Sequence, residues 1–291
     1  MLKVNIETFL ACDASYEKAG IVLYGAPFDS TTSYRPGTRF GSRAIRSESY
    51  GLESYSPYQD RDLTDYAVFD AGDQELCFGD ASLALKDLRE LAAEIAGDGK
   101  IPFMLGGEHL VTLAPVQALA EKYPDLHIIH FDAHADLRDD YLGAKLSHAC
   151  VLRRCWEVLG DGRITQFGIR SGDREEWRWG KEHVTTHPFI VDMEVLQETL
   201  RKLEGKPVYF TLDLDVLDPS VFPGTGTPEP GGISFEELRR AVTQICSAAW
   251  IVGCDVNELS PALDASGAST AVACKIVREM LLALLGNPKI K

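Results

Sequence analysis

The sequence predicts an α/β fold in which a parallel β-sheet is covered on both faces by helices. Short apolar runs bounded by Gly, Pro or Asp recur along the chain, and such runs are typical of strands that are buried on both faces. Longer amphipathic segments of helix-forming residues lie between these runs. Strand and helix therefore alternate, which is the pattern of a parallel sheet with helices on either side.

Six apolar runs predict strands. They are IVLYGAP (21–27), IPFMLGG (101–107), LHIIHFD (126–132), ITQFGIR (164–170), PVYFTLD (207–213) and IVGCDVNE (251–258). Four segments predict helices, and most of them end in Gly or Pro-Asp, which are common stop signals. They are residues 81–99, 109–125, 234–249 and 269–286.

The organisation of the chain predicts one domain over residues 1–291. The length and a hydrophobic content of 45% are sufficient for a large core. No repeat, low-complexity tract or long polar linker divides the sequence. Residues 30–61 are rich in Ser, Tyr, Gly and Arg and have little periodicity, so we expect a long excursion near the ligand-binding face.

The composition excludes several classes of partner. A formal net charge of −15 argues against nucleic acid, which needs a basic face, and favours a cationic ligand. The sequence has no apolar run of about 18 residues, and its start, MLKVNIETFLACD, lacks a secretory signal. We therefore expect a cytoplasmic protein without a membrane partner. The seven cysteines form no C-x-x-C pair and are expected to be reduced.

Four of the predicted strands end in acidic or imidazole residues. Ligands of an open parallel sheet collect outside the carboxyl ends of its strands, so these residues are candidates for a site. They are His109 in GGEH, Asp132, His134 and Asp136 in DAHAD, Asp213 and Asp215 in DLD, and Glu258 in NE.

The spacing of these residues favours a metal site. Side chains at positions i and i+2 of an extended segment point to the same side, so four aspartates and two histidines can converge. Like charges that crowd together raise one another's pKa unless cations offset them. Six ligands are too many for one ion but fit two ions with bridging carboxylates. Oxygen and imidazole ligands without thiolate favour Mn²⁺ over Zn²⁺, although zinc, cobalt and nickel also bind such sites.

A structural interpretation of the same residues exists. One D-x-H-x-D motif at a strand end can be an ordinary turn, and D-L-D can be an Asx turn before a helix cap. Two such clusters together with GGEH, all at strand ends, favour the metal site over this alternative.

Longer motifs carry a resemblance to a known family. The segments GGEH, HFDAHADLRDDY, SHACVLRR, TLDLDVLDPSVFPGTGTPEPGG and DVNELSP resemble the ureohydrolase family of arginases and agmatinases, in the family's order and over nearly the whole chain. The segments FPGTGTPEPGG, SHACVLRR and QFGIRSGDREEW are most similar to bacterial and archaeal agmatinases. The resemblance implies a three-layer α/β/α sandwich with an eight-stranded parallel sheet, two Mn²⁺ ions per chain, and trimers or hexamers.

The resemblance also implies a role for each candidate residue. One manganese ion would be bound by His109, Asp132, Asp136 and Asp213, and the other by Asp132, His134, Asp213 and Asp215. Asp132 and Asp213 would bridge the ions. His148 would handle protons and contact the substrate, either directly or as a relay for Asp136, and Glu258 would bind the guanidinium group. By contrast, we expect His127 and His130 to pack beside or within their strand.

The implied reaction is hydrolysis of agmatine to urea and putrescine, a step of putrescine and polyamine biosynthesis, with a metal-bridging hydroxide as nucleophile. The interval LRDDYLGAKLS before His148 departs from the arginase pattern of Asn, Ser and Thr. It offers Asp139 and Asp140 to an amine-bearing tail, whereas Arg138 would suit a carboxylated substrate. Aminopropylagmatine, guanidinobutyrate, formimidoylglutamate and arginine therefore remain alternative substrates.

Two rival functions are also compatible with parts of the pattern. A single-zinc amide hydrolase, such as a deacetylase on a related fold, would not need all six ligands. A catalytically silent guanidinium-binding homologue would be favoured by a missing ligand, but all six are present together with His148 and Glu258. The sequence therefore favours a binuclear hydrolase.

Overall fold

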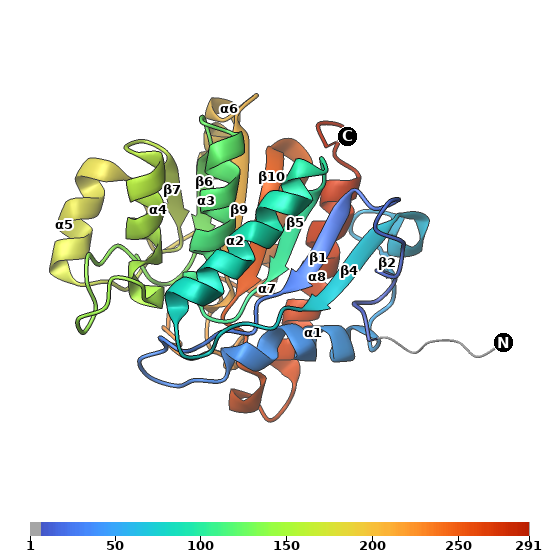
Figure 1. Ribbon diagram of the computed structural model, residues 1–291, viewed down its shortest axis with the longest axis horizontal. Coiled ribbons are helices and arrows are strands. Elements are labelled where there is room, and N and C mark those ends of the chain that lie inside the picture. Colours follow the sequence, from blue (N-terminus) through green and yellow to red (C-terminus); the bar gives the residue numbers. More distant parts are fainter. Residues whose placement is uncertain (1–6, 291) are drawn as a thin grey trace.

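A central sheet of eight parallel strands forms the middle layer of the protein (Figure 1). The computed structural model describes residues 7–290. The strand order is β4 (Val68–Asp73), β1 (Ile21–Gly25), β5 (Ile101–Leu105), β10 (Trp250–Asn257), β9 (Pro207–Asp213), β6 (His127–Phe131), β7 (Ile164–Phe167) and β8 (Thr185–His187). All six predicted strands are confirmed, and the two additional strands form the edges of the sheet.

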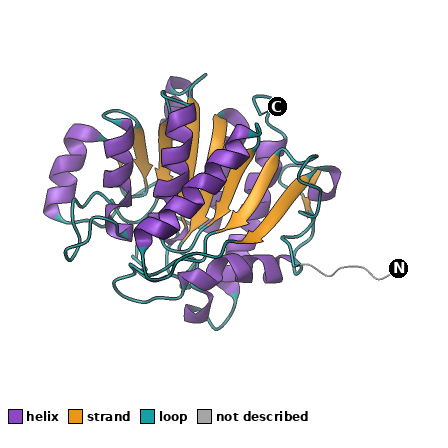
Figure 2. Ribbon diagram, viewed as in Figure 1, coloured by secondary structure: helices purple, strands orange, loops and turns teal. Residues whose placement is uncertain are grey.

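Helices cover both faces of this sheet (Figure 2). One face carries α2 (Ala81–Gly97), α3 (Leu113–Lys122), α4 (Val151–Leu159) and α5 (Arg174–His183). The other carries α1 (Gly41–Ser49), α6 (Met193–Lys202), α7 (Phe235–Ala248) and α8 (Ala268–Leu285). The strands from β4 to β7 in the sheet order supply both cores, because successive side chains point to opposite faces. In β5, for example, Phe103 joins one core and Met104 the other.

Local sequence signals explain where the predicted helices begin. The side chain of Asp80 accepts hydrogen bonds from Ser82 and Leu83 at the start of α2. Ser234 and Glu237 form a capping box at the start of α7, which satisfies backbone donors that the first helical turn leaves free. The segment predicted as one helix from His109 instead begins as a short 3₁₀ helix, His109–Thr112, before α3.

The 30–61 segment is ordered and returns to the body of the protein. It contains α1 and the strand β2 (Tyr55–Ser56), which pairs with β3 (Arg61–Asp62). Its second half is held by α8, because buried Glu279 accepts hydrogen bonds from Ser56 and Gln59, both at 2.8 Å. Its first half reaches the carboxyl ends of the strands, as described below.

The central strands β5, β10, β9 and β6 are neighbours. The candidate residues lie at or just after the carboxyl ends of these four strands. The adjacency of the strands is what brings GGEH, NE, DLD and DAHAD to one place. All seven cysteines are free, and six of them are buried. Within residues 7–290, none of the helices has the length and apolar character needed to cross a bilayer.

Candidate metal centre and active site

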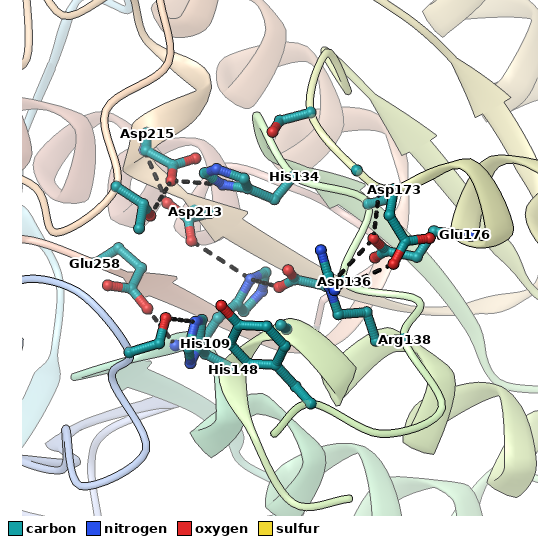
Figure 3. A pocket seen from close by; sticks show the side chains of 17 residues that line it. His109, His134, Asp136, Arg138, His148, Asp173, Glu176, Asp213, Asp215 and Glu258 are labelled. Carbon is teal, nitrogen blue, oxygen red and sulfur yellow. Dashed lines mark hydrogen bonds and ion pairs between the residues drawn. The ribbon is translucent and has the colours of Figure 1, made fainter. Parts of the chain in front are cut away.

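A cavity of about 360 Å³ opens at the carboxyl ends of the central strands (Figure 3). Seven of the eight predicted site residues line it. They are His109, His134, Asp136, His148, Asp213, Asp215 and Glu258. The eighth, Asp132, has no exposed surface and lies against both His109 and His134. The structure therefore brings all eight predicted residues together.

The imidazoles and carboxylates form two groups that share Asp132. His109 Nδ1 lies 2.9 Å from Asp132 Oδ2, 3.1 Å from Asp136 Oδ2 and 3.4 Å from Asp213 Oδ2. His134 Nδ1 lies 3.0 Å from Asp215 Oδ2 and 3.4 Å from Asp132 Oδ1. Asp132 thus presents one oxygen to each histidine, which is the arrangement expected of a carboxylate between two cations.

Hydrogen bonds determine which nitrogen of His109 carries a proton. Thr211 Oγ1 donates its only hydrogen to Asp255 Oδ1 at 2.6 Å, so it acts as an acceptor toward His109 Nε2 at 2.9 Å. His109 therefore donates from Nε2, and Nδ1 has a lone pair available. Among the described residues, this buried Nδ1 has no hydrogen-bond partner, although three carboxylates surround it. A cation between Nδ1 and those carboxylates satisfies all of them.

His130 contacts the same cluster but has a different role. The amide nitrogen of Gln166 donates to His130 Nδ1 at 3.0 Å, and the amide oxygen of Gln166 accepts from Thr186, which fixes the orientation of the amide. His130 Nε2 therefore carries the proton and donates to Asp132 Oδ2 at 2.9 Å. His130 therefore orients the carboxylate of Asp132 and has no free lone pair for a metal. It packs within its strand as expected, and it also has this orienting role.

The backbone around the site is close-packed and locally strained. A Cβ atom on Gly107 would lie 2.0 Å from the carbonyl oxygen of Phe28, so the second glycine of GGEH permits two chain segments to touch. Asp136 has φ 54° and Glu258 has φ 66°, in the left-handed region that side chains other than glycine seldom adopt. Such conformations persist where the surrounding structure enforces them, often at functional sites.

Burial and neighbouring negative charge raise the pKa values of three carboxylates at the site. Burial raises the pKa of Asp136 to about 7, and the charge of Asp132 adds to the effect. Burial also raises the pKa values of Asp213 and Glu258 well above their ordinary values. In Asp132, by contrast, the neighbouring histidines His109, His130 and His134 overcome burial and hold the pKa well below its usual range. The cavity therefore favours bound cations.

These residues fit divalent cations. The donors are carboxylate oxygens and imidazole nitrogens, which suit manganese and related ions. Asp132 belongs to both of two compact groups of potential ligand atoms, one with His109 and His130 and the other with His134 and Asp215. The free lone pair on His109 Nδ1 gives the first group a nitrogen ligand. Asp136 and Asp213 complete this group at the distances given above.

Glu258 and His148 lie on the cavity wall outside this cluster. Glu258 Oε1 accepts a hydrogen bond from the backbone N–H of His109 at 2.7 Å, which leaves Oε2 for a ligand. His148 lies at the start of the 3₁₀ helix before α4, and its Nδ1 is 3.0 Å from the carbonyl oxygen of Thr31. The 30–61 segment therefore contributes directly to the site, in agreement with the expectation of an excursion near the ligand-binding face.

The mouth of the cavity contains one arginine paired with two carboxylates. Arg138 Nη1 lies 3.1 Å from Asp173 Oδ2, and Arg138 Nε lies 3.4 Å from Glu176 Oε2. The Arg138 guanidinium also stacks on the ring of Tyr141, 4.7 Å from its centroid. Asp139, one of the loop acids considered for an amine tail, is outside the cavity lining and pairs with Arg154.

Comparisons with known proteins agree with this site. The chain matches the arginase family over residues 19–283. The agmatinase of Bacillus subtilis (strain 168) is 48% identical over 277 residues, which cover 95% of this chain and 96% of that protein. The N(1)-aminopropylagmatine ureohydrolase of Thermococcus kodakarensis is 38% identical and covers 84% of each chain. The crystal structure of agmatine ureohydrolase of Thermoplasma volcanium has a TM-score of 0.88 at 35% identity, covering 97% of this chain and 95% of that chain.

The matched region includes every strand of the sheet and all eight candidate residues. The family is metal-dependent, and the buried carboxylate and imidazole groups are consistent with that property. The protein is therefore an enzyme of the arginase family, a ureohydrolase built on the three-layer fold that its sequence predicts.

Proposed function

We propose that this enzyme hydrolyses agmatine to urea and putrescine with two Mn²⁺ ions bound at the cluster. The observation that supports this most directly is the convergence of six metal-ligand side chains and Glu258 on one acidic cavity. The similarity to curated agmatinases over nearly the whole chain supports the choice of agmatine. The proposal takes residues 1–291 as one ureohydrolase domain.

The proposed ligands divide between the two ions. His109, Asp132, Asp136 and Asp213 would hold one ion, and Asp132, His134, Asp213 and Asp215 the other. The two oxygens of Asp132, each facing a different histidine, support its assignment as a bridge. When bound, two such ions supply hydroxide at neutral pH as the nucleophile.

Glu258 would orient the substrate in this mechanism. A guanidinium group is always protonated and binds carboxylates through paired hydrogen bonds. The backbone N–H of His109 fixes Oε1 of Glu258, so the carboxylate is held in one orientation before the substrate arrives. Binding a cation there also compensates a carboxylate whose pKa burial has raised. Correct placement of the guanidinium carbon can contribute several kcal/mol to lowering the barrier.

His148 would carry the proton that the departing amine needs. Hydrolysis adds hydroxide to the guanidinium carbon and breaks its bond to the alkyl nitrogen, which must gain a proton to leave. His148 Nδ1 is occupied by the carbonyl oxygen of Thr31, so Nε2 is the atom that accepts and returns the proton. Asp136 would pass a proton toward it.

The mouth of the cavity supports a substrate with a cationic tail. A free arginine there would attract a carboxylate, but Asp173 and Glu176 offset the charge of Arg138. The two acids and one base leave a net negative charge near the expected position of the tail. This pairing favours agmatine or aminopropylagmatine over guanidinobutyrate.

We expect His148 to remain neutral well below the ordinary histidine range. Burial lowers its pKa to about 4. Because the unfolded chain binds this proton first, His148 contributes stability that is lost as the pH falls from about 6.5 to about 4. In zinc-loaded protein, the NMR signals of the His148 ring should stay constant from pH 8 to pH 5. A titration midpoint near 6.5 would show that the ring is not desolvated.

A urea-release assay tests the proposed function. The manganese-loaded enzyme should release urea from agmatine with a kcat/KM at least about tenfold higher than from arginine or guanidinobutyrate, a difference of about 1.4 kcal/mol. Aminopropylagmatine should be included because a relative is named for it. Preference for guanidinobutyrate would contradict the proposed role of the paired Arg138, and absence of urea from every compound would favour a silent homologue.

The family resemblance supports three further parts of the proposal. We infer a homo-oligomer, either a trimer or a hexamer, a cytoplasmic location, and a place in putrescine biosynthesis. The formal charge of −15 supports a cationic small-molecule partner rather than nucleic acid.

A further inference from the structure

We propose that Glu108 is a positioning residue for His148 and acts through the turn at Thr31–Thr32. Glu108 is the acidic residue of GGEH, and it lies outside the proposed set of metal ligands. The inference rests on the proposed function, because it takes His148 as the proton carrier. It assigns a role to the excursion at residues 30–61 as well as to Glu108.

The Glu108 carboxylate is fully buried and receives its hydrogen bonds from one turn. The hydroxyl of Thr31 donates to Oε1 at 2.6 Å, and the hydroxyl of Thr32 donates to Oε2 at 2.9 Å. The backbone N–H of Thr31 lies 3.1 Å from both oxygens. A buried carboxylate requires such donors to offset the loss of water. The turn is thereby held at three points.

The same turn holds His148 from the other side. The carbonyl oxygen of Thr31 is 3.0 Å from His148 Nδ1, and the hydroxyl oxygen of Thr31 accepts from the backbone N–H of His148 at 3.2 Å. A carbonyl can only accept, so Nδ1 must carry the hydrogen. Nε2 then has the lone pair and accepts a hydrogen bond from Ser33 Oγ at 3.3 Å, and His148 lines the cavity (Figure 3).

The direction of each hydrogen bond makes the chain of contacts specific. Because Thr31 gives its hydroxyl hydrogen to Glu108, its oxygen is free to accept from His148. A carboxylate offers acceptors on both oxygens, whereas glutamine would present a donor to one of the two threonine hydroxyls. The contacts therefore select a carboxylate at position 108 and a hydroxyl at position 31.

Glu108 also links this turn to the metal centre. It precedes His109 directly, and its backbone N–H donates to the carbonyl oxygen of Phe28 at 2.8 Å. The loop that carries His109 therefore packs directly against the segment that leads into the Thr31–Thr32 turn. This turn orients His148, the proposed proton carrier. A displacement of about 1 Å in these segments can reduce the rate about 100-fold.

The test compares Thr31→Val with Thr31→Ser in the manganese-loaded enzyme. Valine has the same shape as threonine but lacks the hydroxyl, whereas serine retains it. T31V and E108Q should lower kcat for agmatine about 10- to 100-fold, with the metal content and KM of the unchanged enzyme, and T31S should retain most of the activity. The matched control is E279Q, which alters a buried carboxylate that holds the other half of the 30–61 segment.

A second readout does not depend on turnover. Nitrogen NMR of zinc-loaded protein, with the His148 signals assigned by their loss in H148N, should show hydrogen on Nδ1 in the unchanged protein and in T31S. In T31V a fraction should move to Nε2. Equal kcat and equal tautomers in T31V and T31S would overturn the positioning role. Full activity of H148N would instead overturn the proton-carrier role on which the inference rests.

Discussion

Replacement of Glu258 by glutamine is expected to lower kcat/KM for agmatine at least about 1000-fold, which corresponds to about 4 kcal/mol of transition-state stabilisation. The reason is that removing one charge of a buried pair costs about 2 to 5 kcal/mol or more. Glutamine preserves the size of the side chain and can still accept the hydrogen bond from His109. It removes only the charge that faces the guanidinium group. Steady-state kinetics and elemental analysis of the same sample measure the effect.

The metal content separates this effect from damage to the cluster. E258Q should contain as much manganese as the unchanged enzyme, because Glu258 is placed beside the ligands rather than among them. E279Q, the buried-carboxylate control, should retain kcat/KM. Full activity of E258Q would reject Glu258 as the guanidinium ligand.

Replacement of Asp132 by asparagine is expected to weaken both metal positions together. Asp132 faces His109 with one oxygen and His134 with the other, and it is the one carboxylate of the cluster whose pKa is held low by surrounding histidines. Loss of its charge should reduce manganese affinity by more than the roughly 10- to 100-fold that outer-shell substitutions cost. Urea release should fall in parallel, and metal titration measures both positions.

Asp70 provides the matched control for this variant. It is also buried, but it binds Arg46 and the backbone N–H of Phe9, away from the cavity. D70N should lower the free energy of unfolding without changing the manganese content. Loss of a single ion from D132N, with the other bound at its usual affinity, would show that Asp132 does not bridge.

Much of the site could be predicted because its residues are local in sequence and attached to strong elements. DAHAD and DLD follow buried strands with two-residue spacing, and the parallel sheet places their ends at one edge. The six confirmed strands have continuous apolar sequences, as in PVYFTLD, where every residue of β9 is buried. A strand that is buried on both faces needs apolar residues at nearly every position, so it can be recognised from the sequence alone.

The edge strands could not be recognised in this way. β4 has the sequence VFDAGD and β8 has only three residues, TTH. An edge strand is covered less completely, so it needs fewer apolar residues and gives a weaker pattern. Helices α1, α4, α5 and α6 were likewise not identified individually, although the alternating pattern required helices between the strands.

Residues that act through long-range contacts were also missed. Thr31 reaches His148 and Glu108 from 117 and 77 positions away, and nothing in a Ser-rich segment distinguishes such a residue from an ordinary turn. His130 was expected to pack within its strand, and its hydrogen bond to Asp132 depends on Gln166 from the neighbouring strand β7. The i and i+2 spacing of His130 and Asp132 was the available signal.

The loop before His148 shows why charge alone does not identify a substrate contact. The sequence makes Asp139 a candidate partner for an amine tail, but Asp139 pairs with Arg154 outside the cavity. Asp173 and Glu176, which lie in a different segment, line the mouth instead. The fold, and not the proximity of these residues to His148 in sequence, determines which acids face the ligand.

The number of ions bound per chain is the most direct test of the proposed binuclear centre. A crystal structure of the enzyme saturated with Mn²⁺, with anomalous scattering to locate the metal, should show two ions about 3.5 to 4 Å apart, with Asp132 between them. Elemental analysis of the same preparation should give two ions per chain. One ion per chain under saturating conditions, or ions located away from His109 and His134, would contradict the binuclear site.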